Sequence, residues 1–332
     1  MLFRSYIDNV VECELYKMQK GDILYSHINS LAHVGKVAYY DGKQELYHGM
    51  NLLLMRVNDM VDSNYLYAYM LTSQAKHIAQ VIAKPAVNQA SISINDIRKI
   101  KLPVPPMGEQ RKIAEILGVW DEAIEKQSRL IERLEVRKRA LMQRLLTGLV
   151  RLSGFTTPWQ KVKLGEIAQI RKGKSLTSYE VKCGLYPVIA GGKESPYSHN
   201  EYTDENVITV SASGAYAGYI SYHSHKIWAS DCSVIKEIDT KSNILFMYNL
   251  LLYRQAYIYS LQIGGAQPHV FPKDIERIKL LCPSISEQKA IAEVLTTADD
   301  EIATHRKKLE ALRLQKRGLM QQLLTGKTRV KI

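Results

Sequence analysis

The chain has 332 residues, a formal net charge of +12 and an apolar share of 46%. This length exceeds one ordinary domain, and the composition is that of a globular protein without a membrane-spanning run, since Arg56 interrupts the apolar stretch from Leu52. Charged residues also interrupt any secretion signal at the N-terminus, so we expect a cytoplasmic protein. The positive charge favours nucleic acid as the first candidate partner and an anionic membrane surface as the second.

The chain alternates two mixed regions, here called the first and second heads, with two long helices. Their predicted bounds are 1–105, 106–150, 151–283 and 284–332. In the second head, residues 207–210 and 219–222 are typical of strands. The predicted fold class is therefore α+β, with two α/β heads and two helices.

The two halves of the chain are copies of one unit. Pro105-Pro106-Met107-Gly108-Glu109-Gln110 matches Pro283-Ser284-Ile285-Ser286-Glu287-Gln288, and the offset is 287 − 109 = 178. The same offset relates 141–148 to 319–326, both of which end in Leu-Leu-Thr-Gly. Such self-similarity indicates an internal tandem repeat.

Each long helix carries apolar residues at alternating steps of four and three, which predicts a left-handed coiled coil. The helices most simply pair with each other in antiparallel fashion. Each runs about 36 residues, or about 54 Å, which exceeds one DNA turn of about 34 Å. The seam comprises Ile113, Leu117, Trp120, Ile124, Ile131, Leu134, Leu141 and Leu145, with Ile291, Leu295, Ile302, Leu309, Leu312, Leu319 and Leu323.

Polar residues interrupt the seam in matched positions, Gln127 with His305 and Lys138 with Lys316. Polar side chains at such positions usually specify the register of the helices at some cost in stability. We expect that role for all of them, and no catalytic role for His305.

Catalytic and metal-binding motifs are incomplete. Two Gly-Lys-Ser/Thr triplets lack the first glycine of a phosphate-binding loop. Asp274, Glu287 and Lys289 imitate a nuclease set, but Glu287 and Lys289 point apart at a helix start, where the dipole favours an acidic side chain. His223 and His225 lack a third ligand and are expected on a polar surface. The cysteines form no Cys-x-x-Cys pair, so we expect reduced, mostly buried thiols and no metal.

Other residues suit contact with DNA. Residues 171–175 are interpreted either as a flexible basic loop against phosphates or as a solvated turn. Gln89 and Gln267 occupy equivalent repeat positions, where each amide either pairs with adenine or bonds to backbone. The candidate DNA-binding residues are Arg171, Lys172, Lys174, Ser175, Lys193, Ser211, Ser213, Tyr216, Gln267 and His269 in the second head, and Ser26, His27, Asn29, Gln89 and Ser91 in the first.

The repeated Pro-x-x-x-Glu-Gln-x-x-Ile-Ala-Glu-x-Leu motif, followed by a helix that ends in Leu-Leu-Thr-Gly, resembles the specificity subunit of type I restriction–modification enzymes. The order of heads and helices and the opening 163–167 of the second head fit this likeness, which covers nearly the whole chain.

The resemblance implies that each head is a target recognition domain reading one half of a bipartite site in double-stranded DNA. The helices would form an antiparallel spacer and dock two modification subunits, which bind S-adenosylmethionine and methylate adenine, and motor-nuclease restriction subunits would complete the complex. It implies no catalytic residue, no cofactor on this chain and no membrane partner. The alternatives are a coiled-coil adaptor that binds only proteins and an enzyme that acts alone on nucleic acid.

One departure from the family pattern concerns the first head. It has no counterpart of residues 159–175. We therefore expect an N-terminally short first target recognition domain. A truncated gene, a misassigned start, completion by a separate chain and an inactive subunit are alternative explanations.

Overall fold

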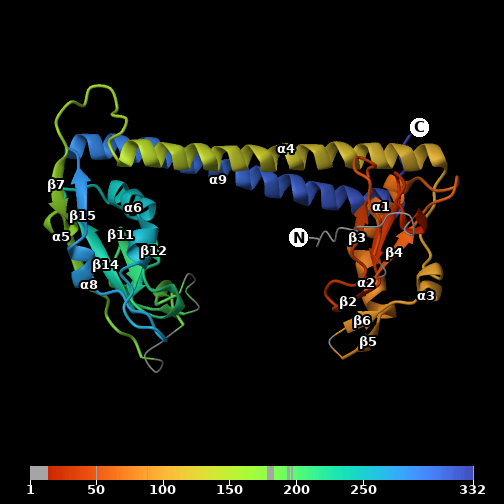
Figure 1. Cartoon of the computed structure of the whole chain (residues 1–332), viewed down its shortest axis with the longest axis horizontal. Coiled ribbons are helices and arrows are strands. Elements are labelled where there is room, and N and C mark those ends of the chain that lie inside the picture. The colour runs from red at the N-terminus through yellow and green to blue at the C-terminus, as the bar shows by residue number, and fades with distance from the viewer. Residues whose placement is uncertain are drawn as a thin grey trace. The chain divides into compact units, whose positions relative to one another are not determined.

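A computed structural model describes residues 14–49, 51–87, 89–177, 183–192, 195 and 197–331. Contacts divide the chain into unit 1, residues 1–129 with 306–332, and unit 2, residues 130–305. Each unit contains one head and a part of both long helices (Figure 1). Among the described residues, no helix is both long and apolar enough to cross a membrane.

The long helices are α4 (Met107–Leu146) and α9 (Ile285–Leu323). Gly148 and Gly326 follow their ends with φ of 74° and 75°, a left-handed conformation that glycine adopts without strain. The predicted seam faces inward throughout. The buried members are Ile113, Leu117, Ile131, Leu134, Leu145, Ile291, Leu295, Ile302, Leu309 and Leu323, and the half-buried ones are Trp120, Ile124, Leu141, Leu312 and Leu319.

The segments of α4 and α9 run antiparallel within each unit. In unit 1, Lys316 Nζ of α9 lies 2.5 Å from Asp121 Oδ1 of α4. In unit 2, Lys138 Nζ lies 2.5 Å from Asp299 Oδ1. Each seam lysine therefore bonds to an aspartate of the facing helix. The two lysines, predicted as a matched pair, thus form two separate ion pairs, and these are equivalent by the repeat.

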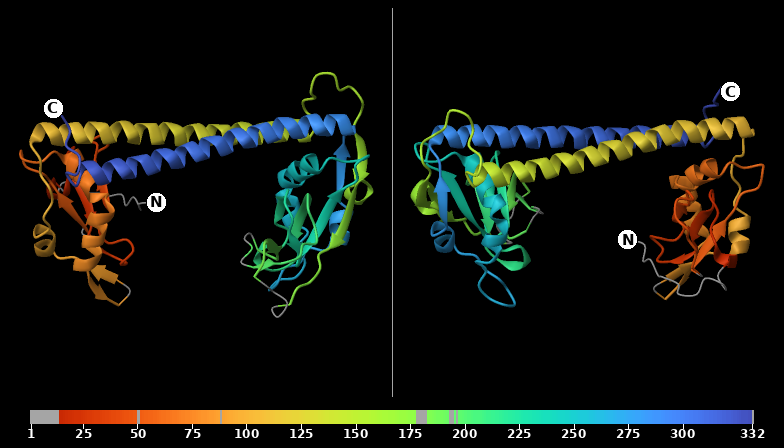
Figure 2. Two further views of the ribbon diagram at one scale, coloured as in Figure 1. Left: turned by 180° about the vertical axis from the view of Figure 1, so that it is seen from behind. Right: turned by 45° about the horizontal axis from the view of Figure 1, so that its top comes forward.

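The head of unit 2 is built on an antiparallel sheet in the order β12-β11-β14-β8. Its strands are β8 (Ala168–Lys172), β11 (Val207–Ser211), β12 (Ile220–His223) and β14 (Cys232–Glu237). A second sheet pairs β7 (Gln160–Lys163) with β15 (Lys279–Cys282), which leads into α9 (Figure 2). A third has the order β10-β9-β13, from Ser198–His199, Tyr186–Ile189 and Trp228–Ala229.

Helices cover the main sheet of unit 2 and join its core to the long helices. They are α5 (Leu164–Ile167), α6 (Ile244–Tyr253), α7 (Gln255–Tyr259) and α8 (Pro272–Glu276), with a 3-10 turn η2 (Gly214–Tyr216). Ile208 of β11 and Phe246 of α6 share one buried cluster with Leu145 of α4 and Leu295 of α9. The coiled-coil seam therefore continues directly into the core of the head, which fixes the head on its helices.

The head of unit 1 has a smaller sheet in the order β3-β1-β4, from β1 (Ile23–Ser26), β3 (Val37–Tyr39) and β4 (Leu52–Met55). A second sheet has the order β2-β6-β5, from Ile28–Asn29, Gln89–Ser91 and Lys84–Ala86. The helical elements are η1 (Glu14–Tyr16), α1 (Ser63–Met70), α2 (Ser73–Ile82) and α3 (Ile94–Arg98). Its core joins Tyr65 and Tyr69 of α1 to Ile113 of α4 and Leu324 after α9.

The two main sheets are equivalent over three strands. Ile23 of β1 pairs with Tyr39 of β3, as Ile208 of β11 pairs with Tyr222 of β12. In unit 2, β14 carries β8 on its outer edge, whereas no described strand of unit 1 pairs with the outer edge of β4.

Candidate nucleic-acid interface

Strand register gathers the predicted residues of the second head at one end of its main sheet. Ser211, at the end of β11, pairs with Cys232 at the start of β14, and the next residue of β14 pairs with Lys172 at the end of β8. Ser213 forms an isolated bridge with His269, which brings the segment 262–269 to the same end. Loops that carry the candidate residues therefore meet there, although the sequence separates them by about a hundred positions.

The side chains at this end differ in exposure. Ser211 is buried, and its hydroxyl donates to the Gly191 carbonyl at 3.0 Å. This bond ties the loop at Gly191 to the end of β11. The Ser213 hydroxyl donates to the Asp231 carboxylate. Tyr216 is 43% exposed, and Gln267 is exposed.

The basic segment 171–175 begins as a strand, because Arg171 and Lys172 lie in β8, and the predicted loop begins only at Gly173. The backbone N–H of Gly173 donates to the Cys232 carbonyl and that of Lys174 to the Ala229 carbonyl, both at 2.8 Å. A side chain at Gly173 would lie 2.2 Å from the Ser230 carbonyl oxygen, so only glycine fits this close approach.

The cations of this segment nevertheless face solvent. Arg171 pairs with Asp204 and its side chain is 50% exposed. Lys174 Nζ lies 5.0 Å from the centre of the Trp228 ring, and Lys172 and Ser175 are exposed. Lys193 lies outside the described residues.

In unit 1 the corresponding residues also gather at one end of the sheet. Ile28 of β2 pairs with Ser91 of β6, next to the end of β1. Ser26 is buried and accepts a hydrogen bond from the Asn29 amide at 3.2 Å. The His27 Nδ1 atom is buried without a hydrogen bond to any described residue, and Gln89 is exposed.

The glutamines of the repeated Glu-Gln motif clasp each head to its helix. The buried Gln110 amide donates to the carbonyls of Met60 at 3.0 Å and Pro105 at 2.8 Å, and accepts from the Asp62 N–H at 2.8 Å. Gln288 makes the equivalent three bonds in unit 2, to Lys241 at 3.1 Å, Pro283 at 3.0 Å and Asn243 at 2.9 Å. Because Asp62 and Asn243 are the N-caps of α1 and α6, these bonds fix the start of a head helix.

The glutamates of that motif lie in the first turns of α4 and α9, as predicted, and both are buried. Glu109 accepts from Arg329 at 2.6 Å in unit 1, and the Arg329 guanidinium holds the pKa of this carboxyl below its usual range. Glu287 accepts from Arg151 at 2.5 Å and from the Trp159 indole at 3.1 Å in unit 2. One signal was available in the sequence, since Arg151 and Arg329 are themselves 178 positions apart.

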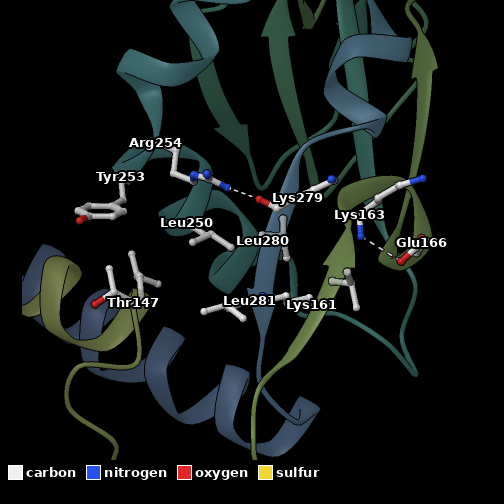
Figure 3. A pocket seen from close by; sticks show the side chains of 12 residues that line it. Thr147, Lys161, Lys163, Glu166, Leu250, Tyr253, Arg254, Lys279, Leu280 and Leu281 are labelled. Carbon is white, nitrogen blue, oxygen red and sulfur yellow. Dashed lines mark hydrogen bonds between the residues drawn. The ribbon is translucent and has the colours of Figure 1, made fainter.

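A cavity of about 750 Å³ lies beside β7 and β15 in unit 2 (Figure 3). Leu250 and Leu280 form part of its apolar wall. Arg254 donates to the Lys279 carbonyl at 2.5 Å, and Glu166 accepts from the Lys163 N–H at 3.0 Å. The one carboxylate in this wall therefore serves to cap α5, and we assign the cavity no catalytic role.

The histidines and cysteines occupy ordinary structural sites. His223 is buried, contrary to the predicted polar surface, and burial lowers its pKa to about 4. Burial raises the pKa of Cys232 to about 12 and of Cys282 to about 11, whereas Cys183 is exposed. Cys13 lies outside the described residues. No group of three His, Cys, Asp or Glu residues within the described part of the chain is placed to hold a metal ion.

The sequence profile of the type I restriction modification DNA specificity domain matches residues 4–136 and 156–314. The chain therefore belongs to this family, in two copies of the domain. The match favours neither the protein-only adaptor nor the self-sufficient enzyme.

Relatives agree with this membership. The chain is 34% identical to a putative type I restriction enzyme MjaX specificity subunit of Methanocaldococcus jannaschii, over 98% of this chain and 83% of the relative. It is 27% identical to the type I restriction enzyme MjaVIII specificity subunit of the same organism, over 99% and 86%. Its fold is similar to the crystal structure of a type I restriction–modification S subunit from M. genitalium, with a TM-score of 0.66, 21% identity and coverage of 92% and 83%.

Proposed function

We propose that this chain confers DNA sequence specificity on a type I restriction–modification complex, and that each head reads one half of a bipartite site. One observation carries the proposal: in both units, register brings exposed polar side chains to one end of the main sheet, and in unit 2 exposed lysines join them. These ends lie away from the long helices within each head (Figures 1 and 2). Direct readout requires such exposed donors and acceptors on a rigid scaffold.

The complex requires other chains for its chemistry. Two modification subunits that bind S-adenosylmethionine and methylate adenine dock on α4 and α9, and motor-nuclease restriction subunits complete the assembly. The helices set the distance between the half-sites. Deleting 122–128 with the facing heptad 309–315 shortens the helix pair by about 10 Å, or about three base pairs. The half-site spacing should change and the bases read should not.

A genome-wide map of adenine methylation tests the proposal, in cells that express this chain with its modification subunits. We expect a split, asymmetric motif. A motif with one defined half, or a palindromic doubling of it, would show that only one head reads DNA. The absence of new methylation would contradict the proposal.

A second test uses the basic segment of unit 2. The Lys172→Glu, Lys174→Glu double variant should weaken binding about equally for all DNA sequences and lower the slope of log K against log salt by about 2. Gln169→Ala, at the opposite end of β8, is the matched control. Unaltered binding by the double variant would show that these lysines do not contact DNA.

A further inference from the structure

Two β-hairpins project from equivalent places in the two heads. In unit 1, β5 and β6 form a hairpin in which Pro85 pairs with Ala90. In unit 2, Ile263 and His269 exchange both backbone hydrogen bonds at 2.9 Å and close a turn around Gly264. We call these segments, 84–91 and 262–269, the hairpin of unit 1 and the hairpin of unit 2. Gln89 and Gln267 occupy the same repeat position in them, 178 residues apart.

Both hairpins are anchored at the base. In unit 1, the Ile92 N–H donates to the His27 carbonyl at 2.9 Å, and Ala90 is buried. In unit 2, the Val270 N–H donates to the Ala212 carbonyl at 3.0 Å, and the Gln262 amide donates to the Ala217 carbonyl at 2.7 Å. A hairpin fixed in this way presents its tip in a defined orientation, which readout of individual bases requires.

Each hairpin carries an exposed glutamine and an exposed branched aliphatic residue, although the two aliphatic residues occupy different repeat positions. Val87 is 92% exposed and Ile263 is 59% exposed. Gln89 and Gln267 are exposed, and neither side-chain amide hydrogen-bonds to any described residue. The described residues therefore give no support to the alternative that these amides are structural bonds to backbone. Both aliphatic side chains are therefore accessible to a partner that approaches the hairpins.

Base-pair chemistry identifies that partner surface. A carboxamide has a donor and an acceptor side by side, which match N6 and N7 of adenine in the major groove. The methyl group of thymine projects into the same groove and offers an apolar contact to an aliphatic side chain. A two-stranded ribbon also fits the width of the major groove.

We propose that the two hairpins enter the major groove, one in each half-site, and that Gln89 and Gln267 each read an adenine. Val87 and Ile263 contact neighbouring thymine methyl groups. This inference rests on the proposed function and identifies the elements by which each head reads sequence.

The experiment uses the full chain in complex with its modification subunits and a library of DNA sites randomised at each motif position. For Gln267→Ala we expect discrimination to fall about 10- to 100-fold at one A·T position in one half-site. For Gln89→Ala the loss should fall in the other half-site. Gln267→Glu should move the preference at its position toward cytosine, whose N4 amino group donates to a carboxylate.

Gln169→Ala is the control outside the hairpin, because its exposed side chain lies at the opposite end of β8. It should relax no single base position. Both tip variants should unfold at the wild-type temperature, since they remove exposed side chains without a bond in the described structure.

The outcomes separate the two proposals. A wild-type bipartite motif together with unchanged or uniformly weakened selectivity in the tip variants would overturn the role of the hairpins and leave the proposed function intact. A wild type without any sequence-specific methylation would overturn both. Relaxation confined to one base pair in each half-site would support both.

Discussion

The two units attach their heads in the same way and differ at the opposite ends of those heads. Gln110 and Gln288 make the same three hydrogen bonds, and Glu109 and Glu287 each hold an arginine that follows the facing helix. The hairpin of unit 2 contains Gly264 and Gly265, whereas that of unit 1 contains Pro85 and Val87 in the same region. The contacts that attach each head to its helix are therefore the same in both units, whereas the residues at the opposite end of the main sheet differ.

This difference matches the proposed division of labour. Attachment positions are buried, so a substitution there leaves polar groups without partners. Hairpin-tip positions are exposed, so they tolerate different side chains at little cost in stability. Two heads with different tips are expected to read different sequences, which is why we expect an asymmetric DNA site.

Substitutions of Gln110 and Gln288, the glutamines that attach each head to its long helix, should have the largest effects on stability. Gln110→Ala and Gln288→Ala each leave a buried N–H and two carbonyls without their partner, which should lower the free energy of unfolding by about 3 kcal/mol. Because the sites lie in different units, the losses should add within about 0.5 kcal/mol. Urea unfolding measures both. A loss below about 1 kcal/mol in one copy only would break the equivalence of the two attachments.

Between pH 6.5 and 4, acid should destabilise unit 2 through His223. Burial lowers the pKa of His223 to about 4 from 6.5, so the unfolded chain binds a proton that the folded chain excludes. The stability contributed above pH 6.5 is therefore lost as the pH falls toward 4, by about 3 kcal/mol. In unit 1 the corresponding residue after β3 is Tyr40. His223→Gln should flatten the pH dependence of urea unfolding over this range, and an unchanged slope would contradict the assignment.

Patterns that depend on local periodicity were predictable from the sequence. The seam of α4 and α9 follows from heptad spacing, and their ends follow from proline and glycine, because both features depend on residues a few positions apart. The bond between Arg151 and Glu287 depends on the antiparallel register of two helices and on the course of the linker. The motif therefore identified Glu287 but not its partner.

The candidate interface was predictable as a set of residues and not as an arrangement. Repeat equivalence identified Gln89 and Gln267, but their exposure follows from hairpins that pair only when the head is folded. Composition predicts a flexible segment at Gly173, whereas the structure pairs this segment with β14, about sixty positions away. Strand register is set by tertiary packing, so composition alone did not reveal it.

A buried hydroxyl distinguishes the central strands of the two main sheets. The Tyr25 hydroxyl is buried without a hydrogen bond to any described residue, and Val210 of β11 occupies the equivalent position in unit 2. Tyr25→Phe should therefore raise the free energy of unfolding by about 1 kcal/mol. Tyr65→Phe is the matched control, because its hydroxyl donates to the Pro103 carbonyl at 2.8 Å, and it should lower stability. A loss of stability in Tyr25→Phe would show that its hydroxyl has a partner.

The smallest effects on the free energy of unfolding should come from the two repeat-equivalent ion pairs between α4 and α9. Asp121 and Asp299 are 60% and 47% exposed, so solvent screens their attraction to Lys316 and Lys138. Asp121→Asn and Asp299→Asn should each cost about 0.5 kcal/mol, and less at high salt.

Charge exchange tests whether these ion pairs specify register. Lys138→Asp alone places two like charges together, and adding Asp299→Lys should restore stability to within about 0.3 kcal/mol. The same exchange between Asp121 and Lys316 should behave alike, because the two ion pairs are repeat equivalents. If one exchange restored stability and the other did not, the helix segments of the two units would differ in packing as their sheet ends do. Equal restoration would instead confine the divergence of the two units to the surfaces that we propose read DNA.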